Sequence, residues 1–216
     1  MNTKQPPMSD RQTINNLENS KSEAKSKAIL QGAMKEFLAN GYAATSMDKV
    51  AKTAKVSKAT IYSHFGDKEN LFNMVIQDLV QDKFNTIMSL EKPQLREQDP
   101  KIILSKMATK MLENAQSDRA FLDFIRIIIG ESGRFPELAR AYVRNVAKPT
   151  IETLTKYFES HPELKLKDPE ATVRVMVGTM AYFIMLQEML HGKDIIPLEG
   201  DRVIDTLTDL ITKDCN

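Results

Sequence analysis

The sequence is poor in several residue types, and each scarcity excludes a class of protein. Its 216 residues include one cysteine, Cys215, which excludes an intrachain disulfide and a cysteine-rich zinc or iron–sulfur site. Tryptophan is absent, and eight glycines and nine prolines are too few for a collagen-like or low-complexity chain. The composition is otherwise that of a globular protein, with 42% hydrophobic and 27% charged residues.

Long apolar segments are missing as well. The longest apolar run, residues 175–186, would form a helix of about 18 Å, whereas the hydrocarbon core of a bilayer is about 30 Å thick. The first residues, MNTKQPPMSDRQ, lack the apolar segment of a secretory signal. We therefore expect a cytoplasmic protein with no membrane partner.

Signatures of catalysis are also absent. His64, His161 and His191 are far apart in the sequence, and neither H-E-x-x-H nor G-x-S-x-G occurs. The phosphate-binding patterns G-x-x-x-x-G-K and G-x-G-x-x-G do not occur either. We expect no enzyme, no metal site and no cofactor.

Charge is distributed unevenly along the chain. Residues 21–68 contain nine lysines against four acidic residues, a net charge of +5, whereas residues 69–216 carry a net charge of −4. A basic first quarter joined to a mildly acidic remainder suggests that one end of the protein meets a polyanion. A solvated, lysine-rich face would give the same pattern, so charge alone does not decide between the two.

Helical periodicity runs through most of the sequence. Ile29, Ala33 and Phe37 recur at the spacing of one helix face, and Asn40-Gly41 supplies a stop because glycine adopts the left-handed conformation without steric cost. Residues 1–21 show no apolar period, which predicts a flexible N-terminal arm. Later helical patterns are separated by breaks at residues 91–100, 130–136, 161–169 and 192–200. The sequence predicts an all-α protein of about nine helices.

Residues 45–64 have the spacing of a helix-turn-helix. Thr45 and Asp48 have the spacing of a capping box, which opens a first short helix. Residues 55–57 form a turn, and Ser57 is placed to cap a second helix of about 10 Å over residues 58–64. Ile61 and Phe65 fall on the inner face of that helix. Its outer face carries Lys58, Thr60, Tyr62, Ser63 and His64.

Such a second helix fits the major groove of DNA, which is about 12 Å wide. Lysines and hydroxyls hold phosphates, and Lys58 or Thr60 is placed to reach base edges. The pattern therefore predicts a DNA-binding protein.

The region around this motif resembles the N-terminal domain of the TetR/AcrR family of transcriptional regulators. The patterns that carry the resemblance are F-x-x-x-G-[YF]-x-x-T-[ST] at residues 37–46, V-S-K-x-T-[IL]-Y-x-H-F at residues 56–65, and Lys-Glu-Asn-Leu at residues 68–71. The resemblance implies a DNA-binding domain over residues 22–82 and a double-stranded DNA operator as partner. It also implies that Thr45 caps the second helix and that Lys68 reaches a phosphate. The predicted DNA-binding residues are Lys25, Lys27, Thr45, Ser46, Lys55, Ser57, Lys58, Thr60, Tyr62, His64 and Lys68.

Some positions depart from the family pattern or allow two interpretations. Lys55 stands where glycine is common, which costs about 1 kcal/mol if the turn needs a positive φ there. Ala59 replaces a frequent glycine or proline, and Ser63 replaces an aromatic residue, which leaves the operator sequence open. The Tyr62 ring packs inside the motif in one interpretation, and its hydroxyl meets a phosphate in the other.

Residues 129–145 resemble the C-terminal domain of the AcrR/AefR-like branch, in which Phe135-Pro136 starts a helix. The resemblance implies that residues 83–216 bind an effector and form a dimer interface. Methionine is common at adaptable apolar sites, and the candidate pocket residues are Met88, Met107, Met111, Phe121, Phe124, Ile125, Ile128, Tyr182, Phe183 and Gln187, with Arg126 as a further polar candidate. The candidate interface residues are Val173, Val177, Gly178, Ala181, Met185, Leu207, Leu210 and Ile211. Ordinary core packing would use the same residues.

These observations lead to one hypothesis and two alternatives. The hypothesis is a homodimeric repressor that a small, largely apolar effector releases from a pseudo-palindromic operator. One alternative is a helical protein-interaction module with weak DNA binding. The other is a regulator that activates transcription or acts without a ligand.

Overall fold

The computed structural model describes residues 8–88 and 98–213, with side chains described for residues 20–80 and 98–213. Within these ranges the chain is helical and contains no strand, as predicted. It forms two compact units, Met1–Val75 and Ile76–Asn216. The division falls within helix α4 (Lys68–Met88), the same helix that holds the predicted boundary at residue 82. No helix of the described residues is long and apolar enough to cross a membrane.

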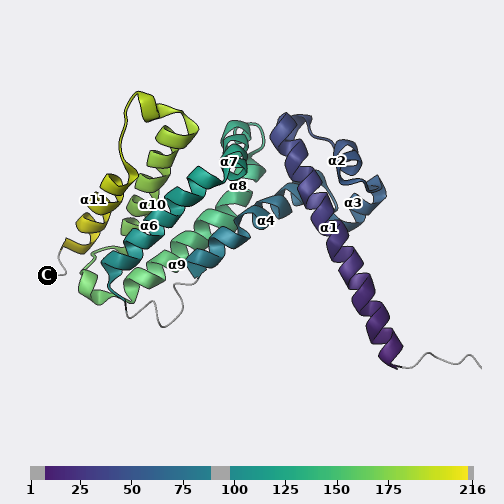
Figure 1. The fold of residues 1–216 in the computed structure, drawn as a ribbon, viewed down its shortest axis with the longest axis horizontal. Helices are drawn as coiled ribbons and strands as arrows, with labels where there is room; N and C mark the ends of the chain where they lie inside the picture. Colours follow the sequence, from purple (N-terminus) through teal and green to yellow (C-terminus); the bar gives the residue numbers. More distant parts are fainter. Residues whose placement is uncertain (1–7, 89–97, 214–216) are drawn as a thin grey trace, which may run out of the picture. The chain divides into compact units, whose positions relative to one another are not determined.

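The first unit consists of α1 (Met8–Ala44), α2 (Met47–Ala54), α3 (Lys58–Phe65) and the beginning of α4 (Figure 1). Its core contains an aromatic cluster in which Phe72 lies edge-on to both Phe37 and Tyr42, with ring centroids 5.0 and 5.2 Å away. The apolar residues predicted to face inward, Ile61 and Phe65, are buried. This core holds the short helices α2 and α3, which are too short to be stable alone.

Helix α1 differs from the prediction at its beginning and agrees with it at its end. It starts at Met8, so most of the segment 1–21 that we predicted as a flexible arm is helical, and that prediction is wrong from residue 8 onward. Extending an existing helix adds one hydrogen bond per residue and needs no apolar face, which explains why periodicity missed it. Gly41 interrupts the helix at φ 73°, which confirms the predicted stop.

The second unit contains α6 (Pro100–Ser117), α7 (Arg119–Glu131), α8 (Pro136–Tyr142), α9 (Lys148–Glu159), α10 (Pro169–Ile184) and α11 (Gly200–Thr212). A π-helical turn, Val143–Ala147, joins α8 to α9, and a second one, Met185–Met189, follows α10. If α8 and α9 are counted as one run, the described residues form nine α-helices, as predicted. Helix α8 begins at Pro136 as the resemblance implied.

Four helices of the second unit, α6, α9, α10 and α11, lie side by side (Figure 1). Asp99 and Asp168 cap α6 and α10 by accepting hydrogen bonds from the backbone N–H groups of Lys101 and Ala171, at 2.8 and 2.9 Å. The core between these helices is built from buried leucine, methionine and aromatic side chains, including Leu104, Leu154, Phe158, Met180 and Leu207.

Candidate DNA-binding surface and ligand cavity

The turn from α1 into α2 is fixed by two hydroxyl side chains with separate tasks. Ser46 is the N-cap of α2, because its Oγ accepts a hydrogen bond from the backbone N–H of Lys49 at 3.3 Å. Thr45 was predicted to be this cap and to bind DNA, but its side chain is buried. Its hydroxyl donates instead to the carbonyls of Gly41 and Glu36, at 2.8 and 3.0 Å. Thr45 therefore ties the end of α1 to the start of α2 and offers no surface to a ligand.

The turn between α2 and α3 has the backbone conformation and the helix cap that the sequence indicated. Lys55 adopts the left-handed conformation, with φ 57° and ψ 40°, so the positive φ considered from the sequence is present. This conformation costs a non-glycine residue about 1 kcal/mol. Ser57 is the N-cap of α3 and accepts a hydrogen bond from the N–H of Thr60 at 3.1 Å. Together these two residues set the direction in which α3 leaves the turn.

Helix α3 has an inner apolar face and an outer polar face. Ile61 is fully buried, whereas Lys58, Ser63 and His64 are exposed and Tyr62 is 46% exposed. Thr60 is half-buried, and its Oγ1 lies 2.8 Å from Ser57 Oγ. The outer face therefore presents an ammonium group, an imidazole and hydroxyl groups on a helix of eight residues, a set that suits a DNA groove.

An ion pair lies on this outer face. Lys58 Nζ is 2.9 Å from Asp48 Oδ2, and both side chains are mostly exposed. The hydrogen bond to Asp48, followed by the charge of that carboxylate, raises the pKa of Lys58. A phosphate that binds at this face would therefore compete with Asp48 for the Lys58 ammonium. Asp48 was predicted only as a capping residue, because sequence spacing does not show that residues ten positions apart meet across two helices.

Lys68 is arranged differently from the prediction. Its Nζ donates hydrogen bonds to the carbonyls of Tyr42 and Thr45, at 2.9 and 3.0 Å, and lies 3.5 Å from that of Ala43. The ammonium also lies 4.2 Å from the centroid of the Tyr42 ring. We predicted a phosphate contact, but the half-buried side chain fastens the start of α4 to the end of α1.

A side-chain hydrogen bond between α3 and α1 was not predicted. His64 Nδ1 lies 3.0 Å from Ser26 Oγ on α1. The predicted phosphate contacts Lys25 and Lys27 are the exposed neighbours of Ser26 in the sequence. The contact places one side of the reading helix beside this basic part of α1. No sequence pattern indicates a pairing between residues 38 positions apart.

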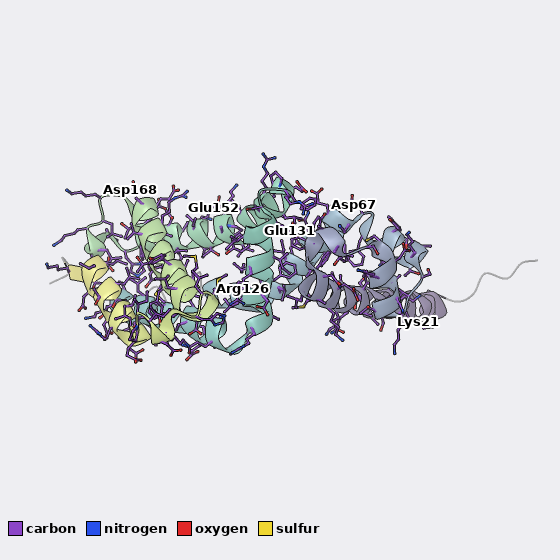
Figure 2. The ribbon with its side chains drawn as sticks, turned by 90° about the horizontal axis from the view of Figure 1, so that it is seen from above. Lys21, Asp67, Arg126, Glu131, Glu152 and Asp168 are labelled. Carbon is purple, nitrogen blue, oxygen red and sulfur yellow. The ribbon has the colours of Figure 1, made fainter. Side chains whose placement is uncertain are left out.

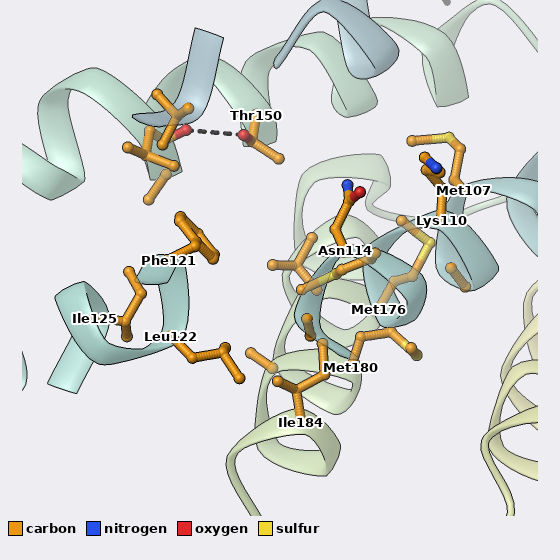
Figure 3. A pocket seen from close by; sticks show the side chains of 18 of the residues that line it. Met107, Lys110, Asn114, Phe121, Leu122, Ile125, Thr150, Met176, Met180 and Ile184 are labelled. Carbon is orange, nitrogen blue, oxygen red and sulfur yellow. Dashed lines mark hydrogen bonds between the residues drawn. The ribbon is translucent and has the colours of Figure 1, made fainter. Parts of the chain in front are cut away.

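The second unit contains a partly open cavity of about 270 Å³. Its walls come from α6, α7, the run from α8 to α9, and α10, with Val80 of α4 as a further member (Figure 3). Four predicted pocket residues line it, and they are Met107, Met111, Phe121 and Ile125. Residues that were not predicted include Asn114, Leu122, Tyr142, Thr150, Met176, Met180 and Met189.

The other predicted pocket residues lie elsewhere. Phe124, Ile128 and Phe183 are buried outside the cavity lining, since they occupy other faces of their helices. Tyr182 is 59% exposed, and Gln187 is buried with its Nε2 donating to the Ile196 carbonyl at 3.0 Å. The side chain of Met88 lies outside the described residues.

Arg126 of α7 is not a pocket residue (Figure 2). Its guanidinium donates hydrogen bonds to the carbonyls of Glu188 and Met189, at 3.2 and 3.0 Å, and pairs with Asp123. A π-helical turn leaves such carbonyls without helical partners, so Arg126 closes the end of the turn that follows α10.

The predicted dimer-interface residues lie in different places, which are the core of the unit, the cavity wall and the exposed surface. Val173, Leu207 and Ile211 are buried in the core of the unit, and Val177 and Ala181 border the cavity. Met185 is half-buried. Gly178 and Leu210 are exposed, the latter by 68%. Most of the residues predicted on α10 lie on its inner stripe, whereas the exposed large apolar residues of that helix are Val175 and Tyr182.

Family models of known proteins match both the helix-turn-helix unit and the second unit of this chain. The model of bacterial regulatory proteins of the TetR family matches residues 29–75, and that of the C-terminal domain of AefR-like transcriptional repressors matches residues 103–212, about half of the chain. The uncharacterized HTH-type transcriptional regulator YhgD of Bacillus subtilis is 48% identical over 56 residues, which are 26% of this chain and 29% of that relative. YvkB of the same organism, also an uncharacterized HTH-type regulator, is 23% identical over 87% of this chain and 95% of its own length.

Solved structures show the same likeness over most of the chain. A TetR-family regulator from Mesorhizobium loti has a TM-score of 0.72 and 26% identity over 88% of this chain and 96% of its own. The flavonoid-responsive regulator FrrA has a TM-score of 0.71 and 29% identity, with the same coverage of 88% and 96%. The chain therefore belongs to the TetR family of DNA-binding transcriptional regulators, has an AefR-like C-terminal domain, and is not an enzyme.

Proposed function

We propose that the protein is a homodimeric repressor that reads its operator with α3 and leaves it when a small molecule fills the cavity of the second unit. The exposed outer face of α3 carries the first part of this proposal, since Lys58, Thr60, Tyr62 and His64 stand on a short helix whose other side is buried. Ser46, Lys55, Lys25 and Lys27 are exposed, as phosphate contacts must be.

A dimer is supported by the size of the reading helix and by an exposed apolar face. One helix of eight residues covers a half-site, so a pseudo-palindromic operator with half-sites about 34–36 Å apart requires two copies. On α10, Val175 and Tyr182 are exposed by 63% and 59%, and a Cβ added at Gly178 between them would meet no atom within 4 Å. This face permits close approach of a second helix. It keeps Gly178 of the predicted interface and adds Val175 and Tyr182.

Two observations support a small-molecule effector. One is the apolar cavity, and the other is a structural relative that is described as responding to flavonoids. FrrA is described as flavonoid-responsive, and its likeness to this chain extends over the second unit. An effector releases DNA only if it binds the free conformation more tightly than the DNA-bound one. We propose that filling the cavity supplies this difference in affinity.

The test is fluorescence anisotropy with DNA from the region upstream of the protein's own gene and unrelated DNA as competitor. Binding that survives competitor and is lost in the double variant Lys58→Ala, Thr60→Ala supports the proposal. The double variant Lys106→Ala, Thr206→Ala is the matched control, because both residues are exposed on the second unit and Thr206 Oγ1 donates to the Arg202 carbonyl of its own helix. Binding that the double variant retains contradicts the assignment of α3. A folded protein that binds no DNA at low salt favours the protein-interaction alternative.

A further inference from the structure

The walls of the cavity are rich in methionine. Five methionines from three parts of the second unit line it, and they are Met107, Met111, Met176, Met180 and Met189. Thioether sulfur is polarizable and makes favourable contacts with aromatic rings, and the unbranched side chain adapts to the shape of what it meets. Phe121 adds an aromatic surface to the same walls (Figure 3). Besides its aliphatic side chains, this lining therefore offers sulfur and ring surfaces against which a flat aromatic ring can pack.

Two polar groups border the cavity without a hydrogen-bond partner among the described residues. One is the Asn114 amide, which extends into the space framed by Phe121, Thr150 and Met107 (Figure 3). The other is the hydroxyl of Tyr142, and burial raises the pKa of Tyr142, so the group stays neutral and able to donate. Thr150 is different, because its Oγ1 already donates to the Val146 carbonyl at 2.8 Å.

Charge restricts the ligand further. Among the described residues that line the cavity, Lys110 is the one charged side chain, and it is exposed and paired with Glu113 at 3.2 Å. Among the described lining residues, a carboxylate has Lys110 alone as a cation and must draw it away from Glu113. A carboxylate buried out of reach of Lys110 loses its hydration without a partner, and burying an unpaired charge is costly. A neutral hydroxyl or carbonyl group carries no such penalty once Asn114 or Tyr142 bonds to it.

We propose that the cavity binds a neutral aromatic molecule that carries a hydroxyl or carbonyl group, with Asn114 and Tyr142 as its hydrogen-bond partners. This inference rests on the proposed function, because it names the chemical class of the effector for the same cavity. Asn114 donates and accepts, and Tyr142 donates, so the pair suits a phenol or an aromatic ketone.

The experiment compares 2-naphthol with 2-naphthoate by isothermal titration calorimetry on the full chain. The two probes share their fused rings, but at neutral pH only the naphthoate is charged. We expect 2-naphthol to bind at least about tenfold more tightly, because the naphthoate must bury its charge among apolar walls or draw Lys110 away from Glu113. Equal or tighter binding of 2-naphthoate overturns the proposal, and so does the absence of binding by both probes.

Two variants locate the polar contacts. Asn114→Leu and Tyr142→Phe are each expected to weaken 2-naphthol about fivefold, the equivalent of one hydrogen bond. Gln116→Leu and Tyr157→Phe are the matched controls, because neither residue lines the cavity, the Gln116 amide pairs with Glu188 at 3.2 Å, and the Tyr157 hydroxyl is buried without a partner among the described residues. Tyr142→Phe removes one hydroxyl with no partner, so thermal unfolding is expected to stay unchanged. A loss no larger than that of the controls overturns the assignment of these residues.

Calorimetry needs no DNA, so the outcome is independent of the proposed release mechanism. Tight binding of 2-naphthol without an effect on DNA leaves the ligand class intact and contradicts the function. Release of DNA by another class of molecule supports the proposed function and contradicts the proposed ligand class.

Discussion

The first unit and the cavity of the second unit use their polar side chains in opposite ways, although Asp99, Asp168 and Arg126 also bond to backbone groups elsewhere in the second unit. In the first unit, Thr45, Ser46, Ser57 and Lys68 donate to or accept from backbone groups and thereby fix where each helix begins. In the second unit, the cavity walls are apolar, and the amide of Asn114 has no partner among the described residues. The difference teaches that hydrogen bonds to the backbone give the DNA-binding unit a fixed geometry, whereas the cavity leaves polar groups without such bonds, as the proposed ligand site requires.

The largest expected effect comes from the side chain that joins α4 to α1. Lys68→Met removes two short hydrogen bonds to carbonyls and the contact with the Tyr42 ring. We expect the free energy of unfolding of the first unit to fall by about 2 kcal/mol, because hydrogen bonds to charged groups are worth more than neutral ones. Denaturant unfolding followed by circular dichroism measures this loss.

The same variant separates a positioning residue from a phosphate contact. If Lys68 only positions α4, the slope of log affinity for DNA against log salt stays unchanged while the affinity falls. Lys58→Met is the comparison, since loss of one phosphate contact reduces that slope by about 1. A reduced slope in Lys68→Met would restore the phosphate contact predicted from the family resemblance.

A smaller effect is expected at the buried threonine. Thr45→Val keeps the shape of the side chain but removes both hydrogen bonds that its hydroxyl donates to α1. We expect the unit to lose about 1 kcal/mol of stability, because the one hydroxyl proton that the two partly buried carbonyls share is lost, although the Glu36 carbonyl still accepts from Asn40 Nδ2. Ser46→Ala, which removes the N-cap of α2, is expected to cost about 1 kcal/mol. Thermal unfolding that shows no loss for Thr45→Val contradicts its role in fixing the turn.

A stabilising change is expected in the turn between α2 and α3. Lys55→Gly relieves the positive φ and is expected to raise the free energy of unfolding by about 1 kcal/mol. Lys52→Gly, at an exposed position inside α2, is the control and is expected to lower stability by about 1 kcal/mol. If both variants lose stability in denaturant titrations, the left-handed conformation of Lys55 carries no strain.

The smallest expected effect concerns the ion pair on the reading face. Asp48→Asn releases the Lys58 ammonium and removes a negative charge near the expected DNA phosphates. We expect DNA affinity to rise about twofold at low salt, the effect of one charge about 8 Å away in water. Anisotropy titrations at two salt concentrations measure it, with Asp67→Asn on the same unit as a control. A fall in affinity would mean that the pair orients Lys58 for DNA.

The sequence predicted the reading helix better than the cavity, for a physical reason. Ser57, Ile61 and Phe65 act through local spacing, and the structure confirms the cap and the buried face. Gly41 ends its helix because of its own backbone freedom, which is also local. The sequence predicted Thr45 as the N-cap of α2, but the structure shows Ser46 in that role. Residue spacing alone does not show that the Thr45 hydroxyl bonds to carbonyls at the end of α1.

The cavity depends on contacts between distant helices, which periodicity does not show. Phe121 and Phe124 belong to the same apolar pattern, but only Phe121 lines the cavity. Likewise, Val173 and Val175 differ in exposure because α10 packs on its neighbours with one face. The sequence did not indicate that Asn114 lines the cavity, because a single amide in a helical pattern is also typical of a solvated face.

The most direct test of the account is whether ligand binding in one unit changes DNA binding by the other. Fluorescence anisotropy of the protein–DNA complex is followed while 2-naphthol is added, with the unchanged protein and Asn114→Leu side by side. We predict that the unchanged protein releases DNA and that the variant needs about fivefold more ligand to do so. If calorimetry shows 2-naphthol bound while the anisotropy of the complex stays unchanged, the account of a ligand-released repressor is contradicted.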